Sequence, residues 1–394
     1  MTKKRSGKRF VERLGNAIKF GRLTVRTQQG CPLHFIGEKD GPDAELIIKK
    51  SGFARKILSG GDIGFAESYM EGICDTPNLT DLIQLGALNE DVAWASFLRG
   101  ASFFRWLALL GHTLRPNSKS GAKRNIKRHY DLGNEFYSSW LDPSMTYSSA
   151  IFPKSTASLE DAQKHKYNLI LEKLNVIASH HILEIGCGWG GFAVYAAQKT
   201  GCKVTALTIS PAQYDFVKQK IEALGLQQKI CVVLCDYRDI TGKFDRIISI
   251  EMLEAVGEAY WSNYFKKVRT LLTNGGRAAI QVITMEETYW DRYKRNPDFI
   301  QQYIFPGGML PTNERLRREV RDANLKLESC NGFGTHYAKT LAAWCKTFDK
   351  KWPSIKKMGF DEHFRRMWRY YFCYCEAGFR IGRVDVVHTI LSRD

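Results

Sequence analysis

One stretch, His181–Gly191, constrains the fold more than any other part of the chain. It reads His-Ile-Leu-Glu-Ile-Gly-Cys-Gly-Trp-Gly-Gly, so an apolar run is followed by an acid and by four glycines within six residues. The residues that follow, Phe192–Ala197, have helical character. Glycine accepts positive φ and leaves no Cβ between the backbone and a ligand, and a helix N-terminus adds unpaired N–H donors. The stretch predicts the strand, tight turn and helix of a nucleotide-binding α/β unit.

The spacing of these glycines is Gly-x-Gly-x-Gly-Gly, which differs from the dinucleotide fingerprint. Glu184 stands two residues before the first glycine. The turn is therefore similar to the first motif of Rossmann-like S-adenosylmethionine methyltransferases, and we assign Glu184, Gly186, Gly188 and Gly190 to a cofactor site. Taken alone, the motif also fits a site for any other nucleotide, or a tight turn that binds no ligand.

Alternating strand and helix patterns continue after this stretch and predict a parallel sheet. Strands are expected at 181–186, 203–208, 230–235, 244–250, 277–284 and 384–391. Helices are expected near 191–200, 211–224 and 259–272, and residues 285–380 read mostly as helix. The predicted fold class is α/β: a Rossmann-like S-adenosylmethionine methyltransferase domain with a smaller N-terminal module and a helical lid insertion.

The predicted domain plan places an N-terminal lipid-associated module at 1–115, a linker at 116–124 and the methyltransferase domain at 125–394. Within the module, residues 46–49 are strand-like, 53–58 are helix-like, and Asn78 or Thr80 is suited to cap a helix that starts near Leu82. Residues 92–114 are rich in aromatics and leucine, which predicts a core helix, with a contact to an acyl chain or bilayer as the alternative.

The formal net charge of +17 favours a polyanionic partner, either nucleic acid or an anionic membrane surface. Residues 1–26 carry nine Lys or Arg against one acid, with apolar residues between them. This pattern fits a basic amphipathic helix on anionic lipid or a solvated tail. No secretory signal and no spanning apolar run is recognised. The ten cysteines are scattered without a Cys-x-x-Cys pair, so no metal site is predicted.

Polar residues follow the predicted strands at the edge where ligands of parallel sheets bind. Thr208 and Gln213 follow the second strand, where an acid commonly holds ribose hydroxyls. Asp236 and Tyr237 follow the third strand, where an acid can accept from an adenine amine and a ring can stack on adenine. Glu251 and Glu254 follow the fourth strand. Each of these residues also fits an ordinary turn or a surface carboxylate.

Further motifs make the chain similar to the cyclopropane fatty acid synthases. The opening segment reads His129-Tyr130-Asp131-Leu132-Gly133-Asn134-Glu135-Phe136-Tyr137, and Trp140–Ala150 continues it. The remaining motifs follow in order: Leu183–Gly191, Thr208–Gln213, Ile304–Gly308 and His336–Leu341. The resemblance covers residues 125–394 strongly. The family includes bacterial cyclopropane synthases, mycolic acid methyltransferases and enzymes that make methyl-branched, tuberculostearic-type fatty acids.

The resemblance implies a site for S-adenosylmethionine. Tyr147 and Ser148 match residues that close over the cofactor, and Gly186 and Gly188 match its backbone cradle. Thr208 and Gln213 match the ribose contacts, and Tyr237 matches an aromatic beside the adenine. Asp236 is assigned by its place at a strand end, not by the resemblance.

The implied reaction is attack of an acyl-chain alkene on the sulfonium methyl, which leaves a carbocation on the chain. Positioning and exclusion of water then matter more than a protein nucleophile. Aromatic faces stabilise a cation, and Tyr130, Phe136 and Tyr147 are candidates. A base must then remove a proton. Loss from the new methyl closes a cyclopropane, whereas loss from an adjacent carbon, after a hydride shift, leaves a methylene that a reductase would turn into a methyl branch.

In many family members a bound bicarbonate is that base. Glu254, Tyr337 and Ile283 match its pocket. Two positions depart, because Ser149 replaces a common Cys and Gln281 replaces a common His, which leaves bicarbonate open. Glu251 replaces a small residue, and its carboxylate would either repel an anion or take part in the proton path.

We therefore expect the chain to transfer a methyl group to the cis double bond of unsaturated phospholipid acyl chains and to form cyclopropane fatty acids. The alternative product on the same substrates is a methylene or methyl-branched chain. Two further functions remain as alternatives: RNA methylation, which is remote, and lipid binding without catalysis. We expect a cytoplasmic enzyme, peripheral at the inner membrane face and without nucleic acid. The basic N-terminal segment and the lid at 285–320 would meet anionic lipid. The cations of the lid are Arg292, Lys294, Arg295, Arg315, Arg317 and Arg318. A reductase partner and a homodimer are left open.

Overall fold

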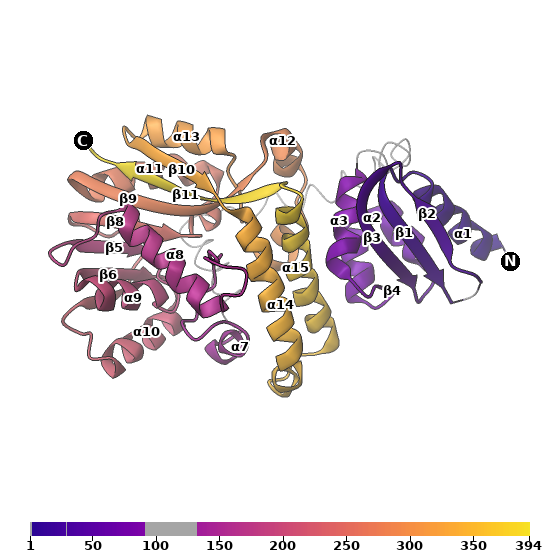
Figure 1. Cartoon of the computed structure of the whole chain (residues 1–394), viewed down its shortest axis with the longest axis horizontal. Coiled ribbons are helices and arrows are strands. Elements are labelled where there is room, and N and C mark those ends of the chain that lie inside the picture. The colour runs from indigo at the N-terminus through magenta and orange to yellow at the C-terminus, as the bar shows by residue number, and fades with distance from the viewer. Residues whose placement is uncertain (1, 29, 91–131) are drawn as a thin grey trace. The chain divides into compact units, whose positions relative to one another are not determined.

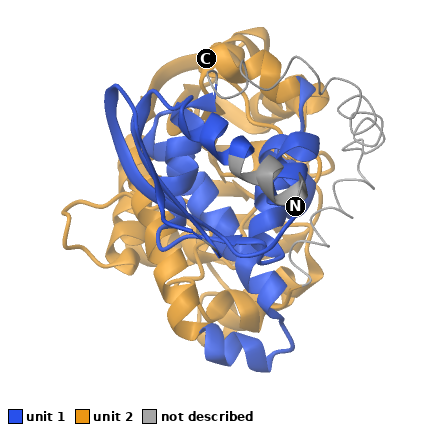
Figure 2. Cartoon of the chain, turned by 90° about the vertical axis from the view of Figure 1, so that its right-hand side faces the viewer, with its two compact units in different colours: residues 1–114, 295–304, 352–382 blue, residues 115–294, 305–351, 383–394 orange. Residues whose placement is uncertain are grey.

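The computed structural model describes residues 2–28, 30–90 and 132–394, and these residues form two compact units (Figure 2). One unit comprises 1–114, 295–304 and 352–382, and the other comprises 115–294, 305–351 and 383–394. The larger second unit holds the glycine-rich stretch.

The larger unit is built on a seven-stranded sheet in the order β10-β11-β9-β8-β5-β6-β7 (Figure 1). The strands are β5 (His181–Ile185), β6 (Lys203–Thr208), β7 (Ile230–Leu234), β8 (Phe244–Ile250), β9 (Leu272–Met285), β10 (Lys326–Gly332) and β11 (Val384–Ser392). Neighbouring strands from β9 to β7 run parallel, whereas β11 pairs antiparallel with β9 and with β10. The predicted α/β class is confirmed, and the sheet is parallel from β9 to β7 as expected but mixed as a whole, because β10 and β11 are added antiparallel.

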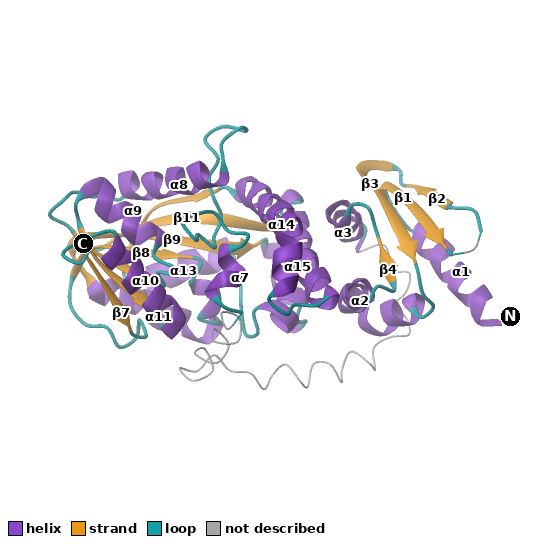
Figure 3. Cartoon of the chain, turned by 90° about the horizontal axis from the view of Figure 1, so that it is seen from below, coloured by secondary structure: helices purple, strands orange, loops and turns teal. Residues whose placement is uncertain are grey.

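Helices cover both faces of this sheet (Figure 3). The helices of the unit are α7 (Asn134–Ser138), α8 (Leu159–Lys173), α9 (Gly191–Thr200), α10 (Pro211–Ala223), α11 (Trp261–Leu271), α12 (Glu287–Arg295) and α13 (Asn313–Asp322), with the short turns η1 (Leu253–Ala255) and η2 (Glu258–Tyr260). Helix α14 (Gly334–Lys357) lies mainly in this unit. Apolar residues of α8, α9 and α10 pack on one face, and those of α11 and α13 pack on the other.

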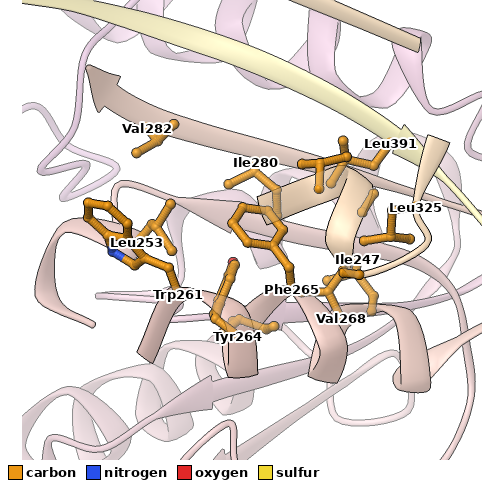
Figure 4. Close-up of a cluster of buried hydrophobic side chains, with 14 of the residues drawn as sticks. Ile247, Leu253, Trp261, Tyr264, Phe265, Val268, Ile280, Val282, Leu325 and Leu391 are labelled. Atoms are coloured by element: carbon orange, nitrogen blue, oxygen red, sulfur yellow. The ribbon is translucent and has the colours of Figure 1, made fainter. Parts of the chain in front are cut away.

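The core on the α11 face shows how the sequence pattern fixes this layering (Figure 4). Trp261, Phe265 and Val268 recur at helical spacing on α11 and are buried against the sheet. Ile247 of β8 and Ile280 of β9 meet them, while their chain neighbours Ile248 and Ala279 face the opposite core. The apolar residues that alternate along the strands and those that recur at the helical period of α11 therefore pack against each other in one core.

The expected strands and helices between 181 and 272 are confirmed to within a few residues, although β9 begins earlier than predicted. The expectation that 285–380 is mostly helix is wrong at Lys326–Gly332, which forms β10. This strand reads Lys-Leu-Glu-Ser-Cys-Asn-Gly and lies at the edge of the sheet, beside β11 only. An edge strand needs little apolar alternation, so the sequence carried no strong strand signal there.

The strand order changes direction at β5. The chain passes from β5 to β6 and β7 on one side, and then returns to place β8 on the other side of β5. Ligands of open α/β sheets bind at such a point, outside the carboxyl ends of the strands. The topology therefore brings the glycine turn after β5 and the two glutamates after β8 to the same edge of the sheet.

The smaller unit contains a four-stranded sheet in the order β2-β1-β3-β4. Its strands are β1 (Phe20–Thr27), β2 (Leu33–Ile36), β3 (Lys39–Ile48) and β4 (Cys74–Asp75), and its helices are α1 (Thr2–Gly15), α2 (Phe53–Met70), α3 (Leu79–Leu88) and α15 (Glu362–Arg380), with the turn η3 (Ile300–Ile304). Asn78 caps α3 by accepting from the Asp81 N–H, as expected, although the helix starts at Leu79. The aromatic stretch 92–114 and the linker 116–124 lie outside the described residues.

Residues that the sequence placed after the linker belong in part to this smaller unit. The Thr80 hydroxyl donates to Glu376 of α15 at 3.0 Å, and the Tyr303 hydroxyl donates to Glu67 of α2 at 2.9 Å. Helix α15 also contacts α2 and α3. The expected division placed all of 125–394 in one domain, whereas the structure groups 295–304 and 352–382 with the N-terminal residues.

Within the described residues, no helix is long and apolar enough to cross a membrane. The same part of the chain has no group of three or more His, Cys, Asp or Glu side chains that could hold a metal ion.

Candidate functional site

The glycine turn after β5 has the backbone geometry of a cofactor cradle. Gly186, Gly188 and Gly190 all have positive φ, at 83°, 53° and 75°. A Cβ added at Gly186 would meet the Met252 side chain at 2.9 Å, whereas one added at Gly188 would project into open space. Gly186 N–H and Cys187 N–H donate to the Leu207 carbonyl of β6, which ties the turn to the sheet. The turn therefore presents bare backbone to an open region beside the start of α9.

Glu184 contributes a buried carboxylate to the strand that precedes this turn. Its side chain is 3% exposed, and Oε2 has no hydrogen-bond partner within the described residues. Burial raises the pKa of Glu184 well above its usual value, while the charge of Lys166 opposes that rise. An orphaned carboxylate oxygen beside a glycine turn fits a cationic ligand group, such as the ammonium group of S-adenosylmethionine.

The two residues assigned to the ribose are brought together at the end of β6. The Thr208 hydroxyl donates to Gln213 Oε1 at 2.8 Å, and both side chains are buried. Ser210 caps α10 by accepting from the Gln213 N–H, which fixes that side chain at the helix start. The arrangement leaves the Gln213 amide N–H₂ as a donor for ribose hydroxyls.

Asp236 and Tyr237 follow β7 as expected, but their side chains have different surroundings. Arg238 binds the Asp236 carboxylate through Nε at 2.8 Å and through a second guanidinium nitrogen. Tyr237 meets the ring of Tyr264 edge-on at 5.4 Å, and burial raises its pKa to about 12. The Asp236 carboxylate is thus already ion-paired, and its contact to adenine stays a prediction, as does that of Tyr237.

Tyr147 and Ser148 lie in a loop that packs against α8 and α14. The Tyr147 ring contacts Tyr137, Trp140 and Trp344 at centroid distances of 5.3 to 5.6 Å. Ser148 is buried and accepts a hydrogen bond from Lys166. Of the other aromatic candidates for facing a cation, Tyr130 lies outside the described residues, and Phe136 is fully buried.

The centre of the site is the carboxylate of Glu251, which three parts of the unit bind. The Ser149 N–H donates to Oε1 at 2.8 Å, and the Gln281 amide donates to the same atom at 2.7 Å. The Tyr337 hydroxyl donates to Oε2 at 2.6 Å. Glu251 itself adopts φ of +50°, an unusual conformation for a residue with a side chain. Its N–H is anchored to the Gln281 carbonyl at 2.8 Å.

Gln281 connects Glu251 to a buried histidine. Gln281 lies opposite His388 on the neighbouring strand β11, and Nε2 of His388 lies 2.9 Å from Gln281 Oε1. Burial lowers the pKa of His388 to about 3, so the ring is neutral. Because the amide oxygen only accepts, Nε2 of His388 carries the proton. Gln281, which replaces the family's common histidine, is therefore itself hydrogen-bonded to a histidine, His388.

Glu254 is the second glutamate of the site. Oε1 accepts from the Ile283 N–H at 2.7 Å, while Oε2 is buried without a partner in the described residues. Burial and the negative charge of Glu251 raise the pKa of Glu254 to about 8. Burial raises the pKa of Glu251 as well, but the hydrogen bonds to its carboxylate and the charge of Lys166 lower it. Here Glu254 holds its proton near neutral pH.

The same contacts test the expected bicarbonate. Four donors were assigned to it or to its neighbourhood: the Ser149 N–H, the Ile283 N–H, the Gln281 amide and the Tyr337 hydroxyl. Each of them already binds a carboxylate oxygen of Glu251 or Glu254. Bringing another anion beside the Glu251 carboxylate would be unfavourable because like charges repel. The residues present therefore do not fit a bicarbonate ion.

Three residues of the site were not identified from the sequence. Lys166 Nζ donates to the Ser148 hydroxyl at 2.7 Å, and Gln163 donates to the Ser148 carbonyl at 2.8 Å. His388 is the third. One signal was available, because both α8 residues share a helix face with the apolar Ile170 and Tyr167. A lysine on the apolar face of a helix departs from the usual pattern.

Comparisons with known proteins find relatives over most of the chain. The profile of the family described as mycolic acid cyclopropane synthetase matches residues 117–389. The tuberculostearic acid methyltransferase UfaA1 of Mycobacterium tuberculosis is 35% identical over 95% of this chain and 90% of its own. The cyclopropane-fatty-acyl-phospholipid synthase of Escherichia coli is 33% identical over 89% of this chain and 88% of its own.

A solved structure supports the same relationship. The cyclopropane synthase MmaA2 from Mycobacterium tuberculosis superposes with a TM-score of 0.65 and 28% identity. The match covers 71% of this chain and 99% of that one.

Proposed function

Because the chain belongs to the mycolic acid cyclopropane synthetase family and is an S-adenosylmethionine-dependent methyltransferase, we propose that it methylates the cis double bond of unsaturated phospholipid acyl chains. Cyclopropane fatty acids are the first product that we propose. The proposal also assigns the proton-accepting step to Glu251. The observation that carries this assignment is the set of three hydrogen bonds that hold its carboxylate.

The hydrogen bonds favour one oxygen of Glu251 as the proton acceptor. Oε1 accepts two hydrogen bonds, from Ser149 and Gln281, whereas Oε2 accepts one, from Tyr337. A carboxylate oxygen accepts about two, so Oε2 retains a free lone pair as far as the described residues are concerned. The donors also stabilise the ionised form, which a base must be in before it acts.

S-adenosylmethionine, when bound, supplies a methyl group on a positively charged sulfur. The residues that would hold it are Glu184, Gly186, Gly188, Thr208 and Gln213. After the alkene carbon has bonded the methyl, the acyl chain carries a positive charge and must lose one proton. Oε2 of Glu251 takes that proton and becomes a carboxylic acid, so the product gains one CH₂ relative to the substrate.

A methylene-branched chain is a second candidate product, with a specific observation in its favour. Glu251 and Gln281 depart from the cyclopropane pattern, and they bind each other at 2.7 Å. The relative aligned over 95% of this chain is named for tuberculostearic acid, a methyl-branched product. A hydride shift along the chain before the proton is lost decides between the two products. Without the shift a cyclopropane closes, and after the shift a methylene forms. A methyl branch would then require a reductase as partner.

The membrane surface is the proposed source of the substrate. Helix α1 forms over Thr2–Gly15, with Phe10 and Val11 buried in its own unit. On the expected lid, Arg317 and Arg318 are exposed, whereas Arg315 is ion-paired with Glu258 at 2.9 Å and lies over the Trp290 ring. Lys294 also pairs with Glu258. Contact with anionic lipid is therefore assigned to the exposed cations, each worth about 1 kcal/mol near such a surface.

The experiment that tests the function mixes the purified chain with methyl-labelled S-adenosylmethionine and vesicles of unsaturated phospholipid. Fatty acids are then analysed by mass before and after mild hydrogenation. A gain of one CH₂ that resists hydrogenation identifies a cyclopropane, and the same gain with uptake of hydrogen identifies a methylene. Absence of label in the lipid, with the cofactor bound, would contradict the proposal.

Vesicle sedimentation tests the membrane contact separately. We expect R317Q/R318Q to weaken binding to vesicles that contain anionic lipid and to leave binding to neutral vesicles unchanged. The matched control is K164Q, since Lys164 is an exposed cation on α8, outside the proposed lid. Equal binding of R317Q/R318Q and the wild type to anionic vesicles would exclude this surface.

A further inference from the structure

Lys166 is an ammonium group enclosed by the larger unit. The residue has no exposed surface, and it is the one Lys or Arg among the buried polar residues of the described chain. Its Nζ donates to the Ser148 hydroxyl at 2.7 Å and lies 4.8 Å from the centre of the Tyr167 ring. A buried charge is costly unless it is paired, so groups of opposite charge are needed near Lys166.

The surroundings are acidic and belong to the proposed site. The charged and titratable groups that act on Lys166 or on Glu251 are Asp142 in the loop after α7, Glu184 of β5, Glu251 and Glu254 after β8, Tyr167 of α8, Tyr337 of α14 and His388 of β11. Four of these groups are carboxyls. Three of them, those of Glu251, Asp142 and Glu184, act on the buried ammonium group of Lys166.

Two consecutive residues, Ser148 and Ser149, connect Lys166 to Glu251. Lys166 holds the Ser148 side chain, and the next residue, Ser149, donates its N–H to Glu251 Oε1 at 2.8 Å. Gln163, one turn earlier on α8, donates to the Ser148 carbonyl at 2.8 Å. Two side chains of a single helix face therefore fix the short segment that binds the carboxylate.

We propose that Lys166 is a positioning residue of the methyl-transfer site, whose buried ammonium group holds Ser148 in place and keeps the Glu251 carboxylate ionised. The inference rests on the proposed role of Glu251 as proton acceptor. The charge of Lys166 opposes the effect of burial, which raises the pKa of Glu251. In turn, burial lowers the pKa of Lys166 to about 7, and Glu251 acts to raise it. Each group thus favours the charged form of the other.

The first test measures the ionisation of Glu251 without any turnover. Infrared spectra of protein labelled with ¹³C-glutamate are recorded against pH, and the difference from E251Q identifies the Glu251 band. We expect K166M to raise the pH of half-ionisation by about one unit or more, the usual effect of removing a nearby opposite charge. We expect K166R, which keeps the charge, to stay near the wild-type value. The matched control K164M removes an exposed lysine of the same helix and should leave the band unmoved.

The second test reads the reciprocal effect on Lys166. In E251Q the pKa of Lys166, followed by NMR of the labelled ε-carbon, should fall below its wild-type value, because linkage between two groups is mutual. This variant keeps the lysine in place, so it gives an answer even if K166M does not fold. An unmoved Glu251 band in K166M, or an unmoved Lys166 resonance in E251Q, would overturn the inference.

The role of Lys166 at Ser148 is tested by titrating S-adenosylmethionine into the same variants. We expect K166M to bind the cofactor up to about tenfold more weakly, as one lost hydrogen bond would give, and K164M to bind like the wild type. Wild-type affinity in K166M would remove this part of the inference. These readouts need no lipid turnover. If the variants show the expected pKa shifts but the wild type methylates no acyl chain, the inference about Lys166 stands and the proposed function fails.

Discussion

The Tyr337 hydroxyl donates a 2.6 Å hydrogen bond to Oε2 of Glu251 and so joins helix α14 to the end of strand β8. The two residues are 86 positions apart in the chain. The bond ends on the oxygen that retains a free lone pair, and it stabilises the ionised carboxylate.

Replacing Glu251 with glutamine should abolish most of the activity. E251Q keeps the size of the side chain but removes the proton acceptor, so we expect the rate of methyl transfer to fall by about 10²–10⁴-fold, the usual contribution of a general base. Cofactor affinity, measured by calorimetry, should stay within a few-fold of the wild type. The control E222Q changes an exposed carboxylate of α10. A wild-type rate in E251Q would assign the base elsewhere.

The wild-type enzyme should not need bicarbonate. Its anion donors are engaged by Glu251 and Glu254, so removing dissolved carbon dioxide and bicarbonate should leave the initial rate unchanged. In E251A the donors on Ser149, Gln281 and Tyr337 would be released, and we expect added bicarbonate or formate to restore part of the activity. A wild-type rate that falls on depletion, and recovers on addition, would contradict our assignment.

Removing the Tyr337 hydroxyl should shift the pH profile. The hydrogen bond favours the charged form of Glu251 and therefore lowers its pKa, so Y337F should raise it. A hydrogen bond to a charged group is worth about 1.5–3 kcal/mol, which corresponds to about one to two pH units. We expect the acidic limb of kcat to move to higher pH by that amount, with little change above it. Y303F removes a Tyr–Glu bond outside the site and should leave the limb in place.

A methyl group added in the glycine turn should weaken cofactor binding, whereas the same change at a glycine outside the site should only lower the stability of the fold. Gly188 has φ of 53° and open space around an added Cβ, so G188A introduces backbone strain of about 1–2 kcal/mol and a methyl group in the cradle. Gly225, after α10, has φ of 66° and equally open space. G225A should therefore lose similar stability in thermal unfolding but retain affinity for S-adenosylmethionine. Equal affinities of the two variants would remove Gly188 from the cofactor site.

Glu254 should make the fold less stable as pH rises. Its pKa is raised to about 8 in the folded chain, above the value near 4.5 expected when unfolded. Between these values the folded state holds a proton that the unfolded state has lost, so the free energy of unfolding falls by up to about 1.4 kcal/mol per pH unit. The stabilisation is complete below the unfolded pKa and is lost as pH approaches 8.

Denaturant unfolding of the wild type and E254Q across this range measures the slope. The variant should have the flatter dependence, because its amide has no proton to lose. Parallel slopes would show that Glu254 ionises normally in the folded chain.

The sequence alone determined the architecture around the cofactor turn. Strand and helix periods from 181 to 272 are local properties, and glycine at positive φ is a local requirement, so the order of elements and the cradle could be read directly. Thr208 and Gln213 lie together for the same reason, since both follow one strand end, and their contact with the ribose stays a prediction. Edge strand β10 was missed because its pattern carries no apolar period.

Only the tertiary structure decided which groups surround the two glutamates. Ser149 is 102 residues from Glu251, Gln281 is 30 away and Tyr337 is 86 away, so no local pattern shows that all three donors converge on one carboxylate. The sequence left open whether Glu251 repels an anion or takes part in proton transfer. Convergence of the strand ends, with Lys166 enclosed beside them, settles the geometry: a carboxylate of the chain itself receives the hydrogen bonds of the pocket.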